Sequence, residues 1–212
     1  MKTLQEIISE GRQDFLDELK KEKERQPLVD QLYLDLYPGC TIETLNFEES
    51  SRNRDLQKKD IDRIIHYNGY EIKISEKFRD NDGWGLKDLV IEIFSDAAKR
   101  KPGWAIESEA HYLFYYKDNK VCIIDAQGLR NVANNIKSQL RGKTRSDIPG
   151  FKKGKPISYP MTIDGKLVNG KIMMPNPKHQ SWDTLNYIMD IEDLESNKNI
   201  NYIKVLDYAT NW

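Results

Sequence analysis

The residues best suited to chemistry lie in one stretch, DIDRIIHYNGYEIKISEK, which runs from Asp60 to Lys77. Two runs rich in β-branched residues flank Asn68-Gly69, the strongest short-range signal for a β-hairpin. A two-residue turn there pairs Asp62 with Ser75 and Asp60 with Lys77, and directly opposite side chains share one face about 5 Å apart. Two carboxylates beside an ammonium group are suited to binding a hard divalent cation and to orienting water or phosphate. The stretch therefore predicts a polar centre at the open end of a hairpin.

A further acid, Glu92, lies in the mostly apolar run DLVIEIF. Burying a carboxylate without a partner costs several kcal/mol, so such an acid usually has one. A divalent cation shared with Asp62 would supply it, because Mg²⁺ prefers one or two carboxylates together with waters and phosphate oxygens. Lys77 would then orient or deprotonate the attacking water, or stabilise charge on phosphate. An ordinary surface network of ion pairs explains the hairpin pattern equally well, and it would contain Asp60, Asp62, Lys73 and Lys77.

Four short blocks occur in order within residues 55–130: Asp60-Ile61-Asp62-Arg63-Ile64, Ile74-Ser75-Glu76-Lys77-Phe78-Arg79, Asp88 to Glu92, and Lys101-Pro102-Gly103-Trp104. In this order they resemble the PD-(D/E)XK nuclease superfamily, which has the restriction-endonuclease-like fold, and a group of uncharacterised phage and bacterial members of it. The resemblance implies an αβββαβ core, Mg²⁺ as cofactor with Mn²⁺ as a substitute, and hydrolysis of phosphodiester bonds. It also implies that Asp62 is the first metal ligand and Lys77 the catalytic lysine.

One position departs from that family pattern, since the acid expected two residues before the lysine is Ser75 here. Glu92 would take over the ligand role in one interpretation, which makes the catalytic set Lys77, Asp62, Glu92 and Ser75. In another interpretation, Glu71 and Lys73 form the acid-x-Lys pair, four residues earlier on the same face of the strand. The hairpin register favours the first, because Glu71 lies near the turn. A third interpretation is a protein that binds nucleic acid without cutting it.

Basic residues that could neutralise backbone phosphates concentrate in the loop 141–156, which contains one acid. A solvated loop is an equally good interpretation of this run. Two further cations lie close in sequence to the hairpin and to Glu92. The predicted nucleic-acid-binding residues are Arg79, Lys101, Arg141, Lys143, Arg145, Lys152 and Lys153. Trp84 and Trp104 flank the third strand and either stack on bases or cap the core, with the core favoured.

The periodicity of apolar residues predicts the elements that position these groups. A helix over 3–25 should end at Pro27, a second helix over 28–36 should end at Pro38-Gly39, and residues 46–59 should form a polar loop. Strands are predicted over 86–95, 111–116 and 119–125, followed by a helix over 126–140. Strands over 157–163 and 166–174, a helix near 181–189 and a last strand near 201–208 complete the chain.

The fold class predicted from these elements is α/β, with a restriction-endonuclease-like αβββαβ core, a central mixed sheet and a C-terminal α+β extension. Residues 1–140 would form the core with its N-terminal helices, and residues 141–212 a basic loop and the extension packed on that core. A length of 212 residues fits this organisation. The net charge of −1 neither supports nor excludes binding to nucleic acid.

Cys40 and Cys122 are far apart and in no metal-binding spacing, which favours reduced structural residues of a cytoplasmic protein. We find no apolar run near the roughly 20 residues that span a membrane. The sequence thus predicts a soluble Mg²⁺-dependent nuclease that resembles phage proteins. Its predicted substrate is nucleic acid, with DNA as the first candidate. The alternative is a catalytically inactive relative, associated with phage or mobile elements, that binds nucleic acid or a protein partner. A homodimer formed through the N-terminal helix is a further alternative.

Overall fold

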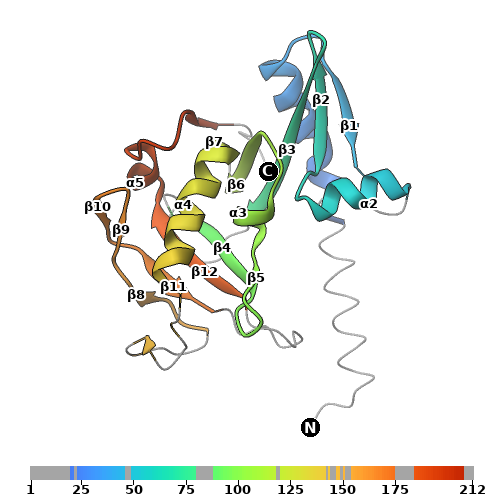
Figure 1. Ribbon diagram of the computed structural model, residues 1–212. Coiled ribbons are helices and arrows are strands. Elements are labelled where there is room, and N and C mark those ends of the chain that lie inside the picture. Colours follow the sequence, from blue (N-terminus) through green and yellow to red (C-terminus); the bar gives the residue numbers. More distant parts are fainter. Residues whose placement is uncertain are drawn as a thin grey trace.

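A computed structural model of the protein describes residues 20–21, 23–45, 49–79, 88–117, 120–141, 143, 147–148, 150, 154–174 and 184–207. The molecule is mixed α/β and contains a central mixed sheet of six strands, as predicted (Figure 1). The strand order is β1 (Thr41–Thr44), β2 (Arg63–Tyr67), β3 (Tyr70–Arg79), β6 (Tyr112–Lys117), β7 (Lys120–Asp125) and β13 (Ile203–Asp207). Only the β3–β6 pair is parallel among these neighbours.

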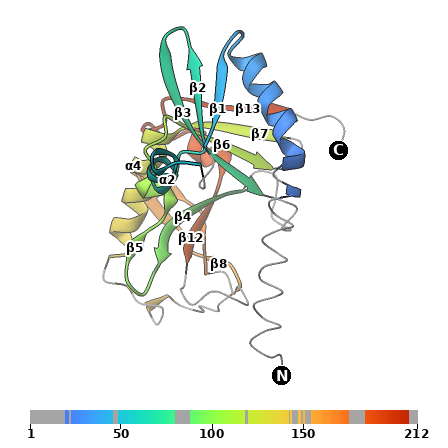
Figure 2. The same cartoon turned by 90° about the vertical axis from the view of Figure 1, so that its right-hand side faces the viewer.

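The predicted hairpin and its register are confirmed. β2 pairs with β3 from Arg63 opposite Ile74 to Tyr67 opposite Tyr70. Asn68 and Gly69 have φ values of 50° and 81°, which the two central positions of this hairpin turn require. The hairpin and β1 extend away from the rest of the molecule (Figures 1 and 2), and Tyr70 at the tip is 75% exposed.

The predicted third strand belongs to a different sheet from the hairpin. β4 (Asp88–Asp96) pairs with β12 (Leu185–Asp190) and with β5 (Lys101–Pro102), and not with β3. The strand order of this antiparallel sheet is β5, β4, β12, β11 (Lys171–Met173) and β8 (Ile157–Ser158), while β9 (Met161–Ile163) and β10 (Lys166–Val168) form a separate hairpin. β4 is long and apolar, and it pairs within its own sheet while packing against the other sheet. The same sequence pattern would fit a meander in which this strand pairs with β3, so the pattern alone does not distinguish the two arrangements.

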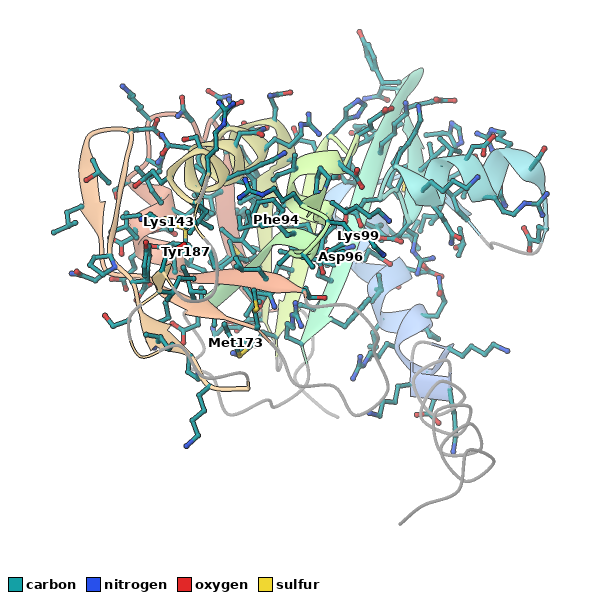
Figure 3. The ribbon with its side chains drawn as sticks, turned by 60° about the horizontal axis from the view of Figure 1, so that its bottom comes forward. Phe94, Asp96, Lys99, Lys143, Met173 and Tyr187 are labelled. Atoms are coloured by element: carbon teal, nitrogen blue, oxygen red, sulfur yellow. The ribbon has the colours of Figure 1, made fainter. Side chains whose placement is uncertain are left out.

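The main core lies between the two sheets and beneath helix α4 (Ala126–Gln139), which was predicted over 126–140. β4 contributes Leu89, Ile91 and Ile93, β6 contributes Leu113 and Tyr115, and α4 buries its Leu129, Val132 and Ile136 against them. Asp125 begins α4 by accepting a hydrogen bond from the backbone N–H of Gln127 at 3.0 Å. At the C-terminal end of β4, Asp96 accepts a hydrogen bond from the Lys99 backbone N–H at 3.1 Å and closes the turn into β5 (Figure 3).

A second core lies on the opposite face of the six-stranded sheet, against the N-terminal helix. Residues 23–36 are helical throughout, so the prediction that Pro27 ends a helix is wrong. Proline removes one backbone donor from a helix, but its ring is exposed here, and the turns that follow bury Val29, Leu32 and Tyr33 against the sheet. Apolar packing therefore outweighs the local penalty. Most of the predicted helix 3–25 lies outside the described residues.

Residues 46–59 are not the polar loop that was predicted, because α2 (Ser51–Lys58) forms within them. The Ser50 hydroxyl accepts a hydrogen bond from the Asn53 backbone N–H at 3.0 Å, which is an N-cap. Leu56 packs against a small cluster of Leu45, Ile61 and Ile64. One leucine among charged residues gave too little periodicity to predict this helix.

The C-terminal residues complete both sheets rather than forming a layer of their own. The helix predicted near 181–189 is wrong, since this region holds strand β12, and the helix α5 (Ile191–Glu195) follows it. β12 occupies a central position beside β4, and β13 pairs with β7 as the predicted last strand. Cys40 and Cys122 are buried free thiols, as predicted. Within the described residues, we find no helix with the length and apolar character needed to cross a bilayer.

Candidate active site

The polar centre predicted at the open end of the hairpin is present. Asp60 lies just before β2 and has a φ of 58°, a left-handed conformation that aspartate tolerates better than most residues. One of its carboxylate oxygens accepts a hydrogen bond from Ser75 Oγ at 2.6 Å, and the other accepts from Lys77 Nζ at 2.5 Å. The predicted pairing of Asp60 with Lys77 across the hairpin is therefore realised by the side chains.

Asp62 lies beside the same lysine. Its Oδ2 accepts a hydrogen bond from the Glu76 backbone N–H at 2.7 Å and lies 3.8 Å from Lys77 Nζ. Its own backbone N–H donates to Ile74 and extends the hairpin ladder by one bond. Lys77 is thus held between two aspartates, which the turn register alone predicts.

Glu92 approaches this cluster from the other sheet. Its carboxylate accepts a hydrogen bond from the backbone N–H of Trp104, the first residue of α3 (Trp104–Glu107), at 3.2 Å. Lys77 Nζ lies 5.3 Å from the centre of the Trp104 ring, and the Lys77 and Glu92 charges act on each other. A Cβ at Gly103 would lie 2.7 Å from Glu92 Cγ, so glycine is required for this close approach. The block Lys101-Pro102-Gly103-Trp104 thus positions Glu92 against the hairpin.

Burial and neighbouring charges shift the pKa values of these groups, and the shifts indicate what each group can do. Burial raises the pKa of the Asp60 carboxyl, although the Lys77 charge opposes it. Burial likewise raises the pKa of Glu92, against the hydrogen bond from Trp104. Burial works to lower the pKa of Lys77, but the Asp62 and Asp60 carboxylates outweigh it and the net pKa is raised. Lys77 is therefore an ammonium group at neutral pH, which suits it to stabilise negative charge and not to remove a proton.

The donor set fits a hard divalent cation only as a partly hydrated site. Three carboxylates face one lysine, so the ionised cluster carries an excess of negative charge. Within the part of the chain that the structure describes, no three Asp, Glu, His or Cys side chains lie close enough together to enclose a metal ion. Mg²⁺ commonly takes one or two carboxylates and completes its shell with waters and phosphate oxygens. Asp62 and Glu92 would be the two carboxylates of such a site, because Asp60 is engaged by Ser75 and Lys77.

A second cation, Arg79, lies on the same strand face as Lys77, two residues further along β3. Its Nε is buried and has no hydrogen-bond partner among the described residues. Its charge also acts on Glu92, where it opposes the rise in the pKa of that carboxyl. A buried donor without an acceptor costs about 1–3 kcal/mol, and an anionic ligand would remove this cost.

The remaining predicted cations have different surroundings. Lys101 and Arg141 are exposed. Lys143 lies 5.1 Å from the centre of the Tyr159 ring and donates to its hydroxyl at 2.5 Å. Arg145, Lys152, Lys153 and Trp84 lie outside the described residues. Trp104 is partly buried against the main core, so it has a core contact as well as a face toward Lys77.

The alternative acid-x-Lys pair lies apart from this cluster. Glu71 is exposed and opposite His66 near the hairpin turn, where His66 Nε2 lies 3.3 Å from a Glu43 carboxylate oxygen. The Lys73 backbone N–H donates to His111 Nδ1 at 3.1 Å. The structure therefore brings Asp60, Asp62, Ser75, Lys77 and Glu92 together and leaves Glu71 outside.

Sequence reasoning missed the buried ion pair behind the cluster. The Arg63 side chain is 3% exposed, and its Nε donates to Glu76 at 3.1 Å. Tyr33 of the N-terminal helix donates its hydroxyl to the same carboxylate at 2.5 Å. Both charged residues fall on the apolar face of the hairpin pattern, and that mismatch was the available signal.

Comparison with protein-family models, curated proteins and solved structures found no match to this chain.

Proposed function

We propose that the protein is a Mg²⁺-dependent nuclease that hydrolyses phosphodiester bonds in nucleic acid, with DNA as the first candidate. The observation that carries this proposal is Lys77, held between Asp60 and Asp62 on one sheet and lying over the ring of Trp104, whose backbone N–H binds Glu92 of the other sheet. Carboxylates and a protonated lysine in a partly buried site are the groups that phosphodiester hydrolysis needs.

The roles follow from the contacts of each group. Asp62 and Glu92 would hold Mg²⁺, which when bound acts as a Lewis acid and makes water a better nucleophile. Lys77 stabilises negative charge on the phosphate oxygens, and Asp60 positions the lysine through their 2.5 Å contact. Arg79, on the same strand face as Lys77, would provide a donor for a second phosphate oxygen.

Ser75 is consistent with a working site in this arrangement. Its hydroxyl donates to Asp60, so it positions the Asp60–Lys77 pair instead of binding the ion. Glu92 then provides the second carboxylate. The fold that we propose is the restriction-endonuclease-like core, supported by helix 23–36 ahead of the β2–β3 hairpin and by β4 after it. Two features depart from that core: β1 and α2 lie between the helix and the hairpin, and β4 pairs with β12.

The deciding experiment is a cleavage assay on purified protein with plasmid, linear and branched DNA, single-stranded DNA and RNA, in Mg²⁺ or Mn²⁺. Lys77→Met and Asp62→Asn should each reduce the rate about 100-fold or more. Lys73→Met is the matched control, because Lys73 lies on the same face of the same strand. It should cut at the wild-type rate, whereas a loss confined to this variant would favour the Glu71–Lys73 pair. Equal cutting by all four proteins would indicate a contaminating nuclease.

A second candidate is a non-cutting protein of the same kind that binds nucleic acid. It is favoured by the engagement of Asp60 with Ser75 and Lys77, which leaves two carboxylates for a metal ion. Binding of nucleic acid without cleavage by wild type, unchanged in Asp62→Asn, would support this candidate over the nuclease.

A further inference from the structure

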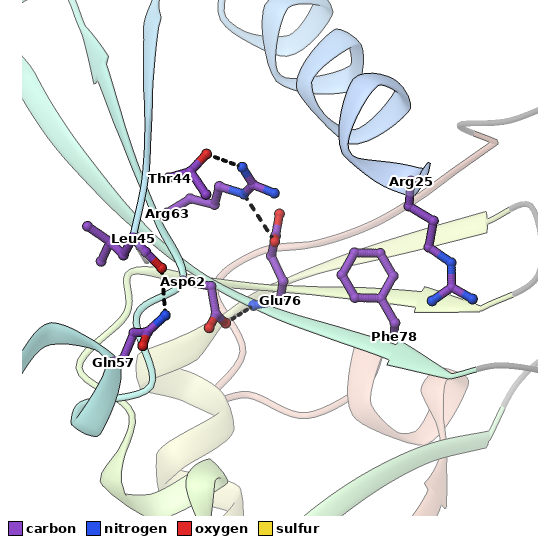
Figure 4. A pocket seen from close by; sticks show the side chains of 8 residues that line it. All are labelled: Arg25, Thr44, Leu45, Gln57, Asp62, Arg63, Glu76 and Phe78. Carbon is purple, nitrogen blue, oxygen red and sulfur yellow. Dashed lines mark hydrogen bonds and ion pairs between the residues drawn. The ribbon is translucent and has the colours of Figure 1, made fainter. Parts of the chain in front are cut away.

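A cavity of about 230 Å³ lies behind the proposed reaction centre (Figure 4). Its lining includes Arg25 of the N-terminal helix, Gln57 of α2, Asp62, and both Glu76 and Phe78 of β3. We call it the Asp62 cavity. Successive side chains of a strand point to opposite faces, so Glu76 and Phe78 face the cavity while Ser75 and Lys77 face the acid cluster.

Asp62 connects the two sides. It lines the cavity, and its Oδ2 also lies 3.8 Å from Lys77 Nζ. A group bound in the cavity would therefore lie directly beside the proposed metal ligand. The occupant of the cavity would therefore be the part of the substrate next to the bond that is cut.

The charges of the lining exclude a phosphate as the natural occupant. The Arg63 guanidinium is already engaged by Glu76 and by Asp30, at 3.1 and 3.4 Å. Arg25 and Asp62 also line the cavity, so the lining holds two cations, Arg25 and Arg63, and two carboxylates, Asp62 and Glu76. With no excess of positive charge, burying an anion there would be costly.

The walls suit a neutral planar group with a polar edge. The Phe78 ring stacks on Tyr116, with ring centres 4.4 Å apart, and the Arg25 guanidinium lies over the Phe78 ring, 5.3 Å from its centre. Phe78 thereby supports the guanidinium plane, and bases pack well on such planes. At the other end, Gln57 Nε2 donates to the Leu45 carbonyl at 2.6 Å (Figure 4), and the Gln57 side-chain oxygen and the Asp62 carboxylate provide acceptors for a polar edge. The volume lies below the roughly 300–1,000 Å³ of drug-sized ligand pockets, which favours a single ring system.

We propose that the Asp62 cavity takes one unpaired nucleobase beside the scissile phosphate, so that the substrate is single-stranded nucleic acid where it is cut. The proposal rests on the nuclease function proposed above. A base within a duplex is stacked and paired, and it enters a cavity only after it has left the stack. Duplex substrates should accordingly be cut only where they are frayed, gapped or looped.

The test measures binding without cleavage. Fluorescence anisotropy in EDTA would compare labelled single-stranded 12-mers of DNA and RNA with 12-mers of the same length whose central nucleotides are abasic. Wild type should bind the intact strands about tenfold tighter than the abasic ones. Arg25→Lys keeps the charge and Phe78→Leu keeps an apolar side chain, so both should lose this preference while their affinity for abasic strands stays unchanged.

Tyr70→Ala is the matched control, because it removes an exposed aromatic ring from the hairpin tip, outside the cavity. Thermal unfolding would establish that Phe78→Leu remains folded, since Phe78 also stacks on Tyr116 with ring centres 4.4 Å apart. A base preference that survives in both cavity variants, or that is lost in Tyr70→Ala alone, overturns the proposal.

A cleavage assay on matched single-stranded and duplex DNA separates the two proposals. Faster cutting of single strands, reduced in both cavity variants, supports both. Equal cutting of single strands and duplex overturns the base-binding cavity and leaves the nuclease standing. A cavity-dependent base preference without any cleavage overturns the nuclease and supports the cavity as a base-binding site.

Discussion

Ser75 shows how one residue changes the design of the cluster. Its side chain is almost fully buried, and its hydroxyl donates to the carboxylate that holds Lys77. A carboxylate at this position would face Asp60 directly, where burial already raises the pKa of the Asp60 carboxyl. The serine therefore allows Asp60 and Lys77 to pair without a further carboxylate in direct contact with Asp60.

We predict that Ser75→Asp lowers the thermal unfolding midpoint in EDTA, because two buried carboxylates would repel each other. Added Mg²⁺ should raise that midpoint more in the variant than in wild type, since the new carboxylate adds a ligand to the proposed site. Differential scanning calorimetry with and without Mg²⁺ measures both effects. Ser51→Asp, on the exposed start of α2, is the control. An equal response of both variants to Mg²⁺ would contradict the metal assignment.

Gly103 is required by the close approach of its backbone to Glu92. We predict that Gly103→Ala destabilises the protein by about 1–3 kcal/mol, as overpacked sites do. It should also reduce cleavage, because the Trp104 N–H that orients Glu92 would be displaced. Urea unfolding and the cleavage assay test this, and the exposed Lys101→Ala on the adjacent strand is the control for stability. Wild-type stability in Gly103→Ala would show that the strand can shift without cost.

At the scale of elements, a buried ion pair attaches the hairpin to the N-terminal helix. Arg63 and Glu76 belong to β2 and β3, and Tyr33 and Asp30 of the helix bind them. We predict that Glu76→Gln destabilises the protein by about 3 kcal/mol, because it leaves a buried guanidinium without its nearest counter-charge. Urea unfolding at neutral pH measures this. Glu71→Gln, on the exposed part of the same strand, should change stability by less than about 0.5 kcal/mol.

A surface ion pair attaches the edge strand β1 to α2. The hydrogen bond from Arg52 is the largest influence on Glu43, and it holds the pKa of that carboxyl below its ordinary 4.5 although burial opposes it. The ionised form is therefore the stabilising one. Its contribution is present above pH 4.5 and is lost as the pH falls through the lowered pKa. We predict that Glu43→Gln costs about 0.5 kcal/mol at neutral pH and nothing in strong acid. Urea titrations at both pH values check this, and an equal loss at both would contradict it.

Elements fixed by local chemistry were predictable, and those fixed by distant partners were not. The Asn68-Gly69 turn determines its own register, and with it the contacts of Lys77. The run LVIEIF predicts a strand but carries no information about its neighbours, so the pairing of β4 with β12 was missed. The strand β12 itself, Leu185–Asp190, was predicted as helix because a short apolar run fits both periods.

At the scale of the whole molecule, the candidate site depends on two sheets that do not share a strand. Lys77 belongs to the six-stranded sheet and Glu92 to the five-stranded one. Their relative position is set by the common core beneath α4 and not by backbone pairing. Ligand geometry in such a site depends on packing, so distant core substitutions should alter it.

We predict that deleting residues 202–212 strongly destabilises the protein and causes concentration-dependent association, because β7 becomes an unprotected edge strand. Deleting only residues 208–212 is the control, since β13 remains. Circular dichroism and sedimentation velocity measure the two effects. Monomeric behaviour of the larger deletion would show that β7 needs no cover.

The position of β12 and β13 in the sheets has a consequence for biosynthesis. Both strands come after residue 184, yet one inserts between β4 and β11 and the other covers β7. A nascent chain on the ribosome must therefore hold the first strands of both sheets with open edges until this late region has emerged. Translation that stalls before that point would release a fragment with open strand edges, which is prone to aggregation.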